Sequence, residues 1–190
     1  TLVAVADYVL KHTPGNTVSN LSSSRALKDV TEAYGQQYHA AAVGEVNVVA
    51  EMKRTHSVIG GEGNGGVIYP ESHYGRDALV GVGLFLSHYV AQSKKMTELK
   101  STYPPYFISK NKMTLSPDMD VDKILEGLKE RYATEKVTDI DGVKIDFAQG
   151  WVHLRKSNTE PIIRIYSEAK DEAAANQLAE EVIAAAKSTL

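Results

Sequence analysis

Apolar residues in the first half of the chain recur alternately at helical and at strand spacing. One helical face runs over residues 2–10 and ends at the Pro and Gly of residues 13–16. The serines at residues 22–24 can cap a second helix, and residues 77–93 form the longest helical pattern. Between the helices we expect strands at residues 17–21, 37–43, 57–60 and 66–69. Strands that alternate with helices predict an α/β/α layered domain with a mixed, mainly parallel sheet.

The pattern changes at residues 93–106, which hold Ser, Lys and a pair of prolines. We therefore predict one domain at residues 1–98 and a second at residues 99–190. In the second domain we expect a strand at 107–115, a helix at 121–132, strands at 137–140, 143–147, 151–155 and 162–168, and a helix at 171–187. The Asp141-Gly142 pair between alternating apolar residues is typical of a tight hairpin. This order predicts a smaller α+β domain with helices on one face of an antiparallel sheet.

Composition and charge exclude several classes of protein. The chain has 190 residues, 43% of them hydrophobic, which suits one or two domains with a buried core. Its net charge of −3, with Lys and Arg dispersed, gives no footprint for nucleic acid. No apolar run approaches the roughly 18 residues of a membrane span, so we expect no membrane partner. The absence of Cys excludes disulfides and thiolate metal sites and fits a cytoplasmic protein.

A short polar segment between two of the predicted strands concentrates groups that bind anions. Arg155 offers a planar guanidinium fork. Short neutral donors follow it, namely Ser157, Asn158 and Thr159. A tight turn can aim these groups and several backbone N–H groups at one phosphate. The alternative is a surface hairpin turn with a single Arg, because Ser, Asn and Thr also favour turns for local reasons.

A second polar segment, residues 61–66, formally matches the dinucleotide-binding pattern G-x-G-x-x-G. That pattern needs a helix directly after the glycines, whereas residues 67–70 are strand-like and end in Pro. A sugar suits the segment better, because Glu62 can accept hydrogen bonds from adjacent hydroxyls and Asn64 can both donate and accept. The glycines would let the backbone approach the ligand. A glycine turn without a ligand is the remaining alternative.

Both segments resemble motifs of the α-D-phosphohexomutases, the family of phosphoglucomutase, phosphomannomutase and phosphoglucosamine mutase. Residues 155–161, RKSNTEP, are similar to the family's phosphate-binding loop, R-[PA]-S-[NG]-T-E-P, with Lys156 in the variable second place. Residues 61–66, GEGNGG, are similar to its sugar-recognition loop, G-E-x-[SN]-G-[HG]. Residues 18–27 resemble the opening of its third domain. The resemblance covers essentially the whole chain and implies the last two domains of a longer enzyme.

The resemblance also implies roles for individual residues. The implied substrate-binding loop consists of Glu62, Gly63, Asn64, Gly65 and Gly66. Within it, Glu62 and Asn64 would contact the sugar hydroxyls. The implied phosphate contacts are Arg155, Ser157, Asn158, Thr159 and Arg164. Gly66 stands where many relatives have His, so the choice among glucose, mannose and glucosamine phosphates stays open.

Several charged residues near these loops have two interpretations. Arg164 either reaches the same phosphate or pairs with Glu168. Glu45 occupies a position where some relatives place a sugar-contacting residue, but a carboxylate that opens a helix is favoured by the helix dipole. We expect Asp77 to cap the helix that follows it. Ordinary surface or packing roles are expected for His56, His73 and His153.

The chain lacks two parts of the family's catalytic machinery. It contains neither a T-A-S-H-N-P type loop with a phosphorylatable Ser nor a D-x-D-x-D type magnesium loop. We interpret the Asp residues at 118–122 and 139–141 as a helix start and a hairpin, not as metal ligands. We therefore expect no catalytic residue and no metal ligand in this chain, which opens at Thr1 directly on a helical pattern.

For the complete enzyme, the resemblance implies Mg²⁺, a phosphoserine and a bisphosphosugar intermediate. The partners of this portion would be a hexose phosphate and the missing N-terminal domains. Without those domains we expect it to be inactive. A sugar-phosphate-binding module without catalysis is the alternative.

Overall fold

The structure is a computed structural model that describes residues 1–116, 119–157 and 159–188. The chain divides into two compact units, Thr1–Pro105 and Tyr106–Leu190. This division comes later than the predicted boundary after residue 98, which would cut the helix α5 (Met96–Ser101). Leu99 of α5 is buried, and Tyr103 donates a hydrogen bond to Asp7. These contacts hold the segment before the division on the first unit.

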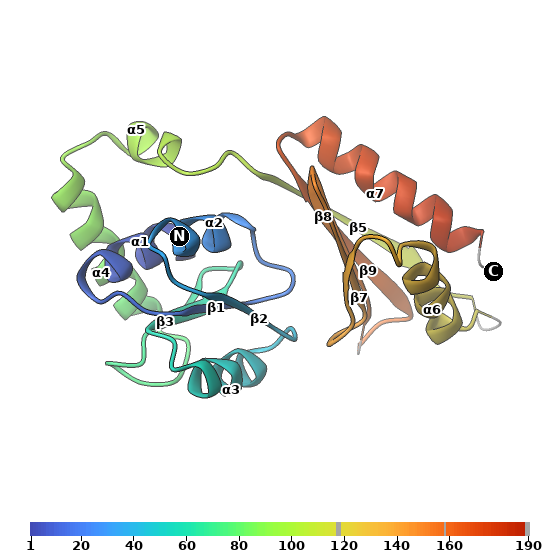
Figure 1. The fold of residues 1–190 in the computed structure, drawn as a ribbon, viewed down its shortest axis with the longest axis horizontal. Helices are drawn as coiled ribbons and strands as arrows, with labels where there is room; N and C mark the ends of the chain where they lie inside the picture. Colours follow the sequence, from blue (N-terminus) through green and yellow to red (C-terminus); the bar gives the residue numbers. More distant parts are fainter. Residues whose placement is uncertain (117–118, 158, 189–190) are drawn as a thin grey trace. The chain divides into compact units, whose positions relative to one another are not determined.

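The described residues of the first unit form one sheet in the strand order β2-β1-β3-β4 (Figure 1). Its strands are β1 (Thr17–Asn20), β2 (Tyr38–Ala41), β3 (Ile59–Glu62) and β4 (Gly66–Ile68). Strand β1 pairs in parallel with β2 and with β3, whereas β4 pairs antiparallel with β3. The prediction of a mixed, mainly parallel sheet is therefore confirmed.

Helices cover both faces of this sheet (Figure 1). They are α1 (Leu2–His12), α2 (Ala26–Ala33), α3 (Glu45–Thr55) and α4 (Ala78–Gln92). Val9 of α1 and Val67 of β4 belong to one buried cluster, and Met52 of α3 and Ile68 of β4 belong to another. Neighbouring residues of a strand point to opposite faces, so β4 contributes to both cores. These are the α/β/α layers that the sequence predicts.

The described residues of the second unit form an antiparallel sheet in the order β5-β9-β8-β7-β6. The strands are β5 (Phe107–Thr114), β6 (Lys136–Thr138), β7 (Val143–Phe147), β8 (Gly150–Lys156) and β9 (Ile162–Ala169). The helices are α6 (Val121–Arg131) and α7 (Glu172–Lys187). Both helices lie on one face of the sheet, which confirms the predicted α+β arrangement (Figure 1).

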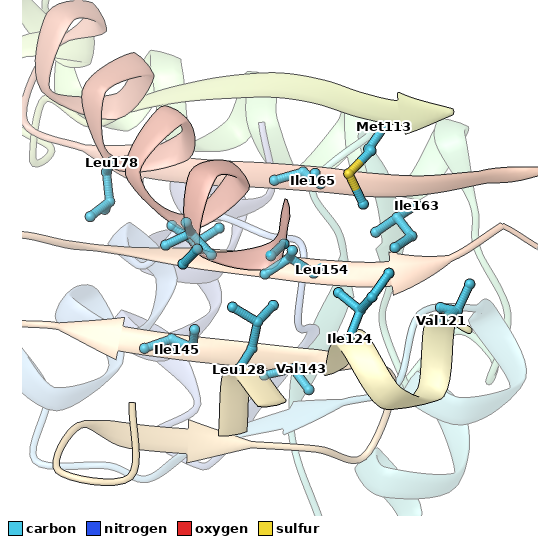
Figure 2. Close-up of a cluster of buried hydrophobic side chains, with 14 residues drawn as sticks. Met113, Val121, Ile124, Leu128, Val143, Ile145, Leu154, Ile163, Ile165 and Leu178 are labelled. Atoms are coloured by element: carbon cyan, nitrogen blue, oxygen red, sulfur yellow. The ribbon is translucent and has the colours of Figure 1, made fainter. Parts of the chain in front are cut away.

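Side chains from both helices meet the sheet in one buried cluster. Figure 2 shows Leu128 of α6 and Leu178 of α7 among Ile145, Leu154 and Ile165 of the strands. All of these side chains are buried. Their burial removes apolar area from water and fixes which face of the sheet the helices cover.

The opposite face of this sheet presents two of the candidate phosphate-binding side chains, Arg155 and Arg164. Leu154 of β8 belongs to the core under the helices. Its neighbours His153 and Arg155 therefore point to the other face. Arg155 pairs in register with Arg164 of β9, so both guanidinium groups leave the sheet on the face away from the helices.

The start of α6 and the turn between β6 and β7 agree with the sequence-based predictions. Asp120 caps α6, because its carboxylate accepts hydrogen bonds from the backbone N–H groups of Asp122 and Lys123, as the helix-start interpretation requires. Asp118 lies outside the described residues. The hairpin between β6 and β7 is confirmed, although β6 ends at Thr138 instead of residue 140. Gly142 in its turn has a φ of +67°, a conformation that favours Gly.

Candidate functional site

The glycine-rich segment is the hairpin turn between β3 and β4. Glu62 ends β3 and pairs in register with Gly66, the first residue of β4. The backbone N–H of Gly65 donates to the carbonyl oxygen of Glu62 over 3.1 Å. The side-chain oxygen of Asn64 accepts from the N–H of Gly66, also over 3.1 Å. A strand, not a helix, follows the glycines, so the arrangement that a dinucleotide-binding loop requires is not present.

Glu62 is buried beneath this turn, with 5% of its surface exposed. Its Oε1 accepts a hydrogen bond of 2.9 Å from Nδ2 of Asn20, and its Oε2 accepts one of 3.2 Å from Nη1 of Arg76. Each carboxylate oxygen can accept more than one hydrogen bond. Glu62 is therefore an oriented acceptor whose position depends on two residues that the sequence analysis did not single out as its partners.

Residues 18–27, the third motif of the resemblance, hold the glycine turn through side-chain hydrogen bonds. Oδ1 of Asn20 accepts from Oγ of Ser23 over 2.8 Å and from the backbone N–H of Ser22 over 3.1 Å. Oγ of Ser23 in turn accepts from the backbone N–H of Gly63 over 2.8 Å. Both Asn20 and Ser23 are buried, so this chain of hydrogen bonds fixes the glycine turn against β1.

Glu45 is the first residue of α3, as the sequence predicts, but its carboxylate is held by a residue far along the chain. Oε1 accepts from the backbone N–H of Arg76, and Oε2 accepts from Nε of Arg76, each over 2.8 Å. The hydrogen bond from this backbone N–H, together with the guanidinium, lowers the pKa of Glu45. Pairing with Glu45 and, to a smaller extent, the charge of Glu62 raise the pKa of Arg76. Glu45 and Arg76 therefore form a charged pair at neutral pH.

These residues border an open pocket of about 510 Å³. Its lining consists of Glu45, Asn64, Gly65, Gly66, Arg76 and Ala78. The pocket joins part of the predicted sugar loop to the start of α3 and the start of α4. Asp77 caps α4 beside it, as predicted, by accepting from the backbone N–H of Val80 over 3.0 Å.

The candidate phosphate-binding turn joins β8 to β9 in the second unit. The backbone N–H of Ser157 donates to the carbonyl oxygen of Ile162 over 3.0 Å and closes the hairpin. The Ser157 side chain is buried, and its Oγ lies 3.4 Å from the backbone nitrogen of Thr159. Nε of Arg155 is buried without a hydrogen-bond partner among the described residues. Asn158 lies outside the described residues.

Arg164 has a partner that the sequence analysis did not consider. Its Nη2 donates to Oε2 of Glu160 over 3.1 Å. The expected alternative partner, Glu168, instead accepts at Oε1 from Nε1 of Trp151 over 2.8 Å. The pair with Glu160 is partly exposed and spans one end of the turn, so a strong anion could compete for the guanidinium.

Two of the histidines near the loops form contacts with neighbouring protein groups. His73 lies 3.0 Å from Asp77 at Nε2 and is half exposed. His153 is buried, and its Nε2 donates to the carbonyl oxygen of Asp141 over 2.7 Å. Burial lowers the pKa of His153 to about 4. This agrees with a packing role for His153.

Two family models match the chain. The model described as phosphoglucomutase/phosphomannomutase, alpha/beta/alpha domain III, matches residues 1–106. The model described as phosphoglucomutase/phosphomannomutase, C-terminal domain, matches residues 110–185. The chain belongs to the phosphoglucomutase/phosphomannomutase family.

Individual members of this family are similar over most of the chain. A phosphoglucomutase/phosphomannomutase from Thermococcus kodakarensis is 37% identical over 183 residues, which are 95% of this chain and 40% of the relative. A phosphoglucosamine/phosphogalactosamine mutase from Sulfurisphaera tokodaii is 36% identical over 167 residues, which are 87% of this chain and 37% of the relative. The chain therefore spans about two fifths of the length of the curated relatives it matches.

A solved structure supports the fold. The crystal structure of a phosphoglucomutase/phosphomannomutase family protein from Burkholderia thailandensis superposes with a TM-score of 0.80 at 23% sequence identity. The match covers 99% of this chain and 41% of that one. At this identity the likeness concerns the architecture of the two units and not the ligands of either protein.

The described part of this family member offers no place for a metal ion. No three side chains of His, Asp or Glu gather there in a way that could hold one. As a separate finding, the described residues contain no helix that is long and apolar enough to cross a membrane. The Mg²⁺ that the family resemblance implies therefore does not fit the described residues, and no role of theirs depends on it.

Proposed function

We propose that this chain is the sugar- and phosphate-binding C-terminal portion of a phosphohexomutase. The complete protein would interconvert hexose 1-phosphates and hexose 6-phosphates. The observation that carries the proposal is the open pocket at the glycine turn, because it is lined by Asn64, Gly65 and Gly66 of the predicted sugar loop. Family membership supports the reaction class.

The first unit would recognise the sugar ring. Glu62 and Asn64 supply acceptors and a donor at the turn. Asn20 holds Glu62, and Ser23 holds the backbone of Gly63, before a ligand arrives. A site that is already ordered loses less conformational entropy on binding. The proposed sugar contacts are thus oriented by the fold, not by the ligand.

The second unit would hold the phosphate that is not reacting. Arg155 and Arg164 leave the same sheet face side by side, and the turn adds Ser157, Thr159 and, from the sequence, Asn158. A hydrogen bond between a charged donor and phosphate contributes roughly 1.5–3 kcal/mol. Nε of Arg155 has no protein partner among the described residues to give up, which makes this guanidinium the main anchor.

In the complete enzyme, a phosphoserine outside this chain would donate its phosphoryl group to the free hydroxyl of the hexose phosphate. The product is a bisphosphosugar, and the phosphoryl group at the other position would then return to the serine. Holding the sugar and the distant phosphate positions either hydroxyl for in-line transfer. This chain alone would therefore bind but not catalyse. The absence of Cys supports a cytoplasmic location as part of the proposal.

A chimera tests the catalytic part of the proposal. This chain would replace the matched C-terminal portion of the Thermococcus kodakarensis relative, which is 37% identical to it. We expect the chimera to interconvert glucose 1-phosphate and glucose 6-phosphate and to lose at least about tenfold in kcat/KM with Arg155→Ala, since one charge-assisted hydrogen bond is removed. A folded chimera without mutase activity towards glucose, mannose or glucosamine phosphates would contradict the proposal.

A sugar-phosphate-binding module without catalysis is the second candidate. It is favoured by the pocket at the glycine turn, whose lining offers hydrogen-bonding groups for a sugar without requiring any reacting group. The chimera separates the two candidates, because a binding module would retain sugar-phosphate binding while the chimera stays inactive.

A further inference from the structure

We infer that Arg76 is a specificity-determining residue of the sugar pocket, in which its guanidinium donates hydrogen bonds to hydroxyl oxygens of the bound hexose. This inference rests on the proposed function, because it concerns the same pocket. Arg76 lies 14 residues beyond Glu62 in the chain and outside the glycine turn, directly before the N-cap residue of α4. Its role follows from how the surrounding residues hold it.

Two carboxylates fix the guanidinium of Arg76 in one orientation. Nε donates to Glu45 and Nη1 donates to Glu62, and the backbone N–H of Arg76 also donates to Glu45. A guanidinium has five N–H donors, and these contacts use two of them. Among the described residues, none accepts from Nη2. Donor capacity therefore remains on a side chain that lines the pocket and has 45% of its surface exposed.

Gly66 makes room for this arrangement. A Cβ atom at residue 66 would lie 2.5 Å from Cδ and 3.1 Å from Cγ of Arg76. Any side chain at this position would push the Arg76 stem away from its two carboxylate partners. The absence of a side chain at Gly66 and the position of Arg76 are thus two parts of one structural feature.

The charges around Arg76 indicate which ligand atoms it would contact. Glu45 and Glu62 flank the guanidinium, so two acidic side chains surround one basic one. The two carboxylates would repel an anionic group of the ligand, such as a phosphate, but would not repel the neutral oxygen of a sugar hydroxyl. Donors held in fixed positions reject a ligand that leaves them unpaired more strongly than mobile donors do. Arg76 should therefore distinguish hexoses that differ in the configuration or substitution of one carbon.

A binding experiment on the 190-residue chain tests the inference. The dissociation constants of glucose 6-phosphate, mannose 6-phosphate and glucosamine 6-phosphate would be measured by NMR titration for the wild type, Arg76→Ala and Arg76→Lys. We expect the wild type to separate the three sugars and Arg76→Ala to reduce the ratio of its extreme dissociation constants by at least about fivefold. Arg76→Lys keeps the charge but cannot reach both carboxylates in a planar fork, so we expect it to behave like Arg76→Ala.

Arg54→Ala is the matched control, because Arg54 forms a similar two-bond pair with Glu51 on the exposed side of α3. Its variant should retain the wild-type ratios. The Nε–H resonance of Arg76 offers a direct signal and should shift with each hexose phosphate but not with inorganic phosphate. Unchanged ratios in Arg76→Ala, or an Nε–H shift that inorganic phosphate reproduces, would overturn the inference while leaving the proposed function intact.

A double-mutant cycle provides a second test, in which the position of Arg76 is disturbed without removing its side chain. It compares the effect of Gly66→Ala in the wild type with its effect in Arg76→Ala. In the wild-type background Gly66→Ala should reduce the sugar ratios, because it displaces the Arg76 stem. In the Arg76→Ala background the same change should have a smaller effect, left by the contact of the added Cβ with Oδ1 of Asn64 at 3.2 Å. Additive effects would overturn the inference. If the wild type binds none of the three sugar phosphates, the proposed function and the inference fail together.

Discussion

Tyr103 donates a hydrogen bond of 2.8 Å to Oδ2 of Asp7, a residue 96 positions earlier in the chain. Tyr34 donates to the other oxygen of Asp7 over 2.7 Å, and Nε2 of His88 lies 2.7 Å from the Tyr103 hydroxyl. Since that hydroxyl donates to Asp7, His88 donates to it. This network joins α1, the residue that follows α2, α4 and the segment that precedes the division between the units.

The first prediction concerns this network. Asp7→Asn should lower the free energy of unfolding of the first unit by roughly 2–4 kcal/mol, because two tyrosine hydroxyls lose a charged acceptor. Tyr103→Phe should cost about 1–3 kcal/mol, since the hydrogen bonds of its hydroxyl with Asp7 and with His88 are removed and the ring stays. Urea unfolding followed by circular dichroism measures both.

Tyr74→Phe is the control, because Tyr74 is exposed and its ring contact with Lys53 does not need the hydroxyl. It should leave the unfolding midpoint unchanged. If Tyr103→Phe is as neutral as Tyr74→Phe, the network does not stabilise the unit.

The second prediction concerns pH. Burial, together with the positive charges of Lys144 and Arg155, lowers the pKa of His153 to about 4 from an ordinary value of 6.5, although the Asp141 carbonyl acts in the opposite direction. The unfolded chain then binds more protons than the folded chain between pH 6.5 and pH 4. The stability that comes from keeping His153 neutral is therefore fully present above pH 6.5. It is lost as the pH falls, so the free energy of unfolding decreases by on the order of 3 kcal/mol by pH 4.

The measurement compares the slope of unfolding free energy against pH between wild type and His153→Gln. We expect a shallower slope in the variant, even if its stability at neutral pH is lower. His12→Gln, at an exposed position in α1, serves as the control and should keep the wild-type slope. A wild-type slope in His153→Gln would show that His153 does not titrate as its burial implies.

The third prediction concerns the turn between β6 and β7. Gly142 has a φ of +67°, and a Cβ atom there would overlap the carbonyl oxygen of Leu154. Gly142→Ala should therefore destabilise the second unit by about 2 kcal/mol or more, through the unfavourable φ and the clash with the backbone. The melting temperature of the chain reports the loss.

Gly83→Ala offers the opposite case, because Gly83 is helical and a Cβ atom added there would meet nothing within 4 Å. Ala is favoured over Gly by about 1 kcal/mol in a helix interior, so this change should stabilise the first unit slightly. Equal effects of the two substitutions would contradict the account of the turn.

The order of elements was predictable because it depends on local periodicity. Apolar residues at strand spacing predicted β7, β8 and β9. Because Leu154 of β8 points into the core, its neighbour Arg155 points to the opposite face of the sheet. The Asp-Gly turn followed from backbone sterics at Gly142. The family resemblance rested on contiguous motifs, and the family models agree with it.

The contacts around the pocket at the glycine turn were not predictable in the same way. Glu45 and Arg76 are 31 residues apart, and Asn20 and Glu62 are 42 apart. No periodicity connects such pairs, because they meet only when the sheet and its helices have formed. The helix α5 was missed for a related reason, since its polar residues resemble a linker and only the burial of Leu99 shows that it packs.

The most direct test of the central claim is calorimetric titration of the chain with glucose 1-phosphate. We predict binding by the wild type and at least about tenfold weaker binding by Arg155→Ala, since the anchoring guanidinium is lost. Arg131→Ala, at the end of α6 in the same unit, should bind like the wild type. Binding that is equally tight in wild type and Arg155→Ala would contradict the assignment of the polar turn as the phosphate site.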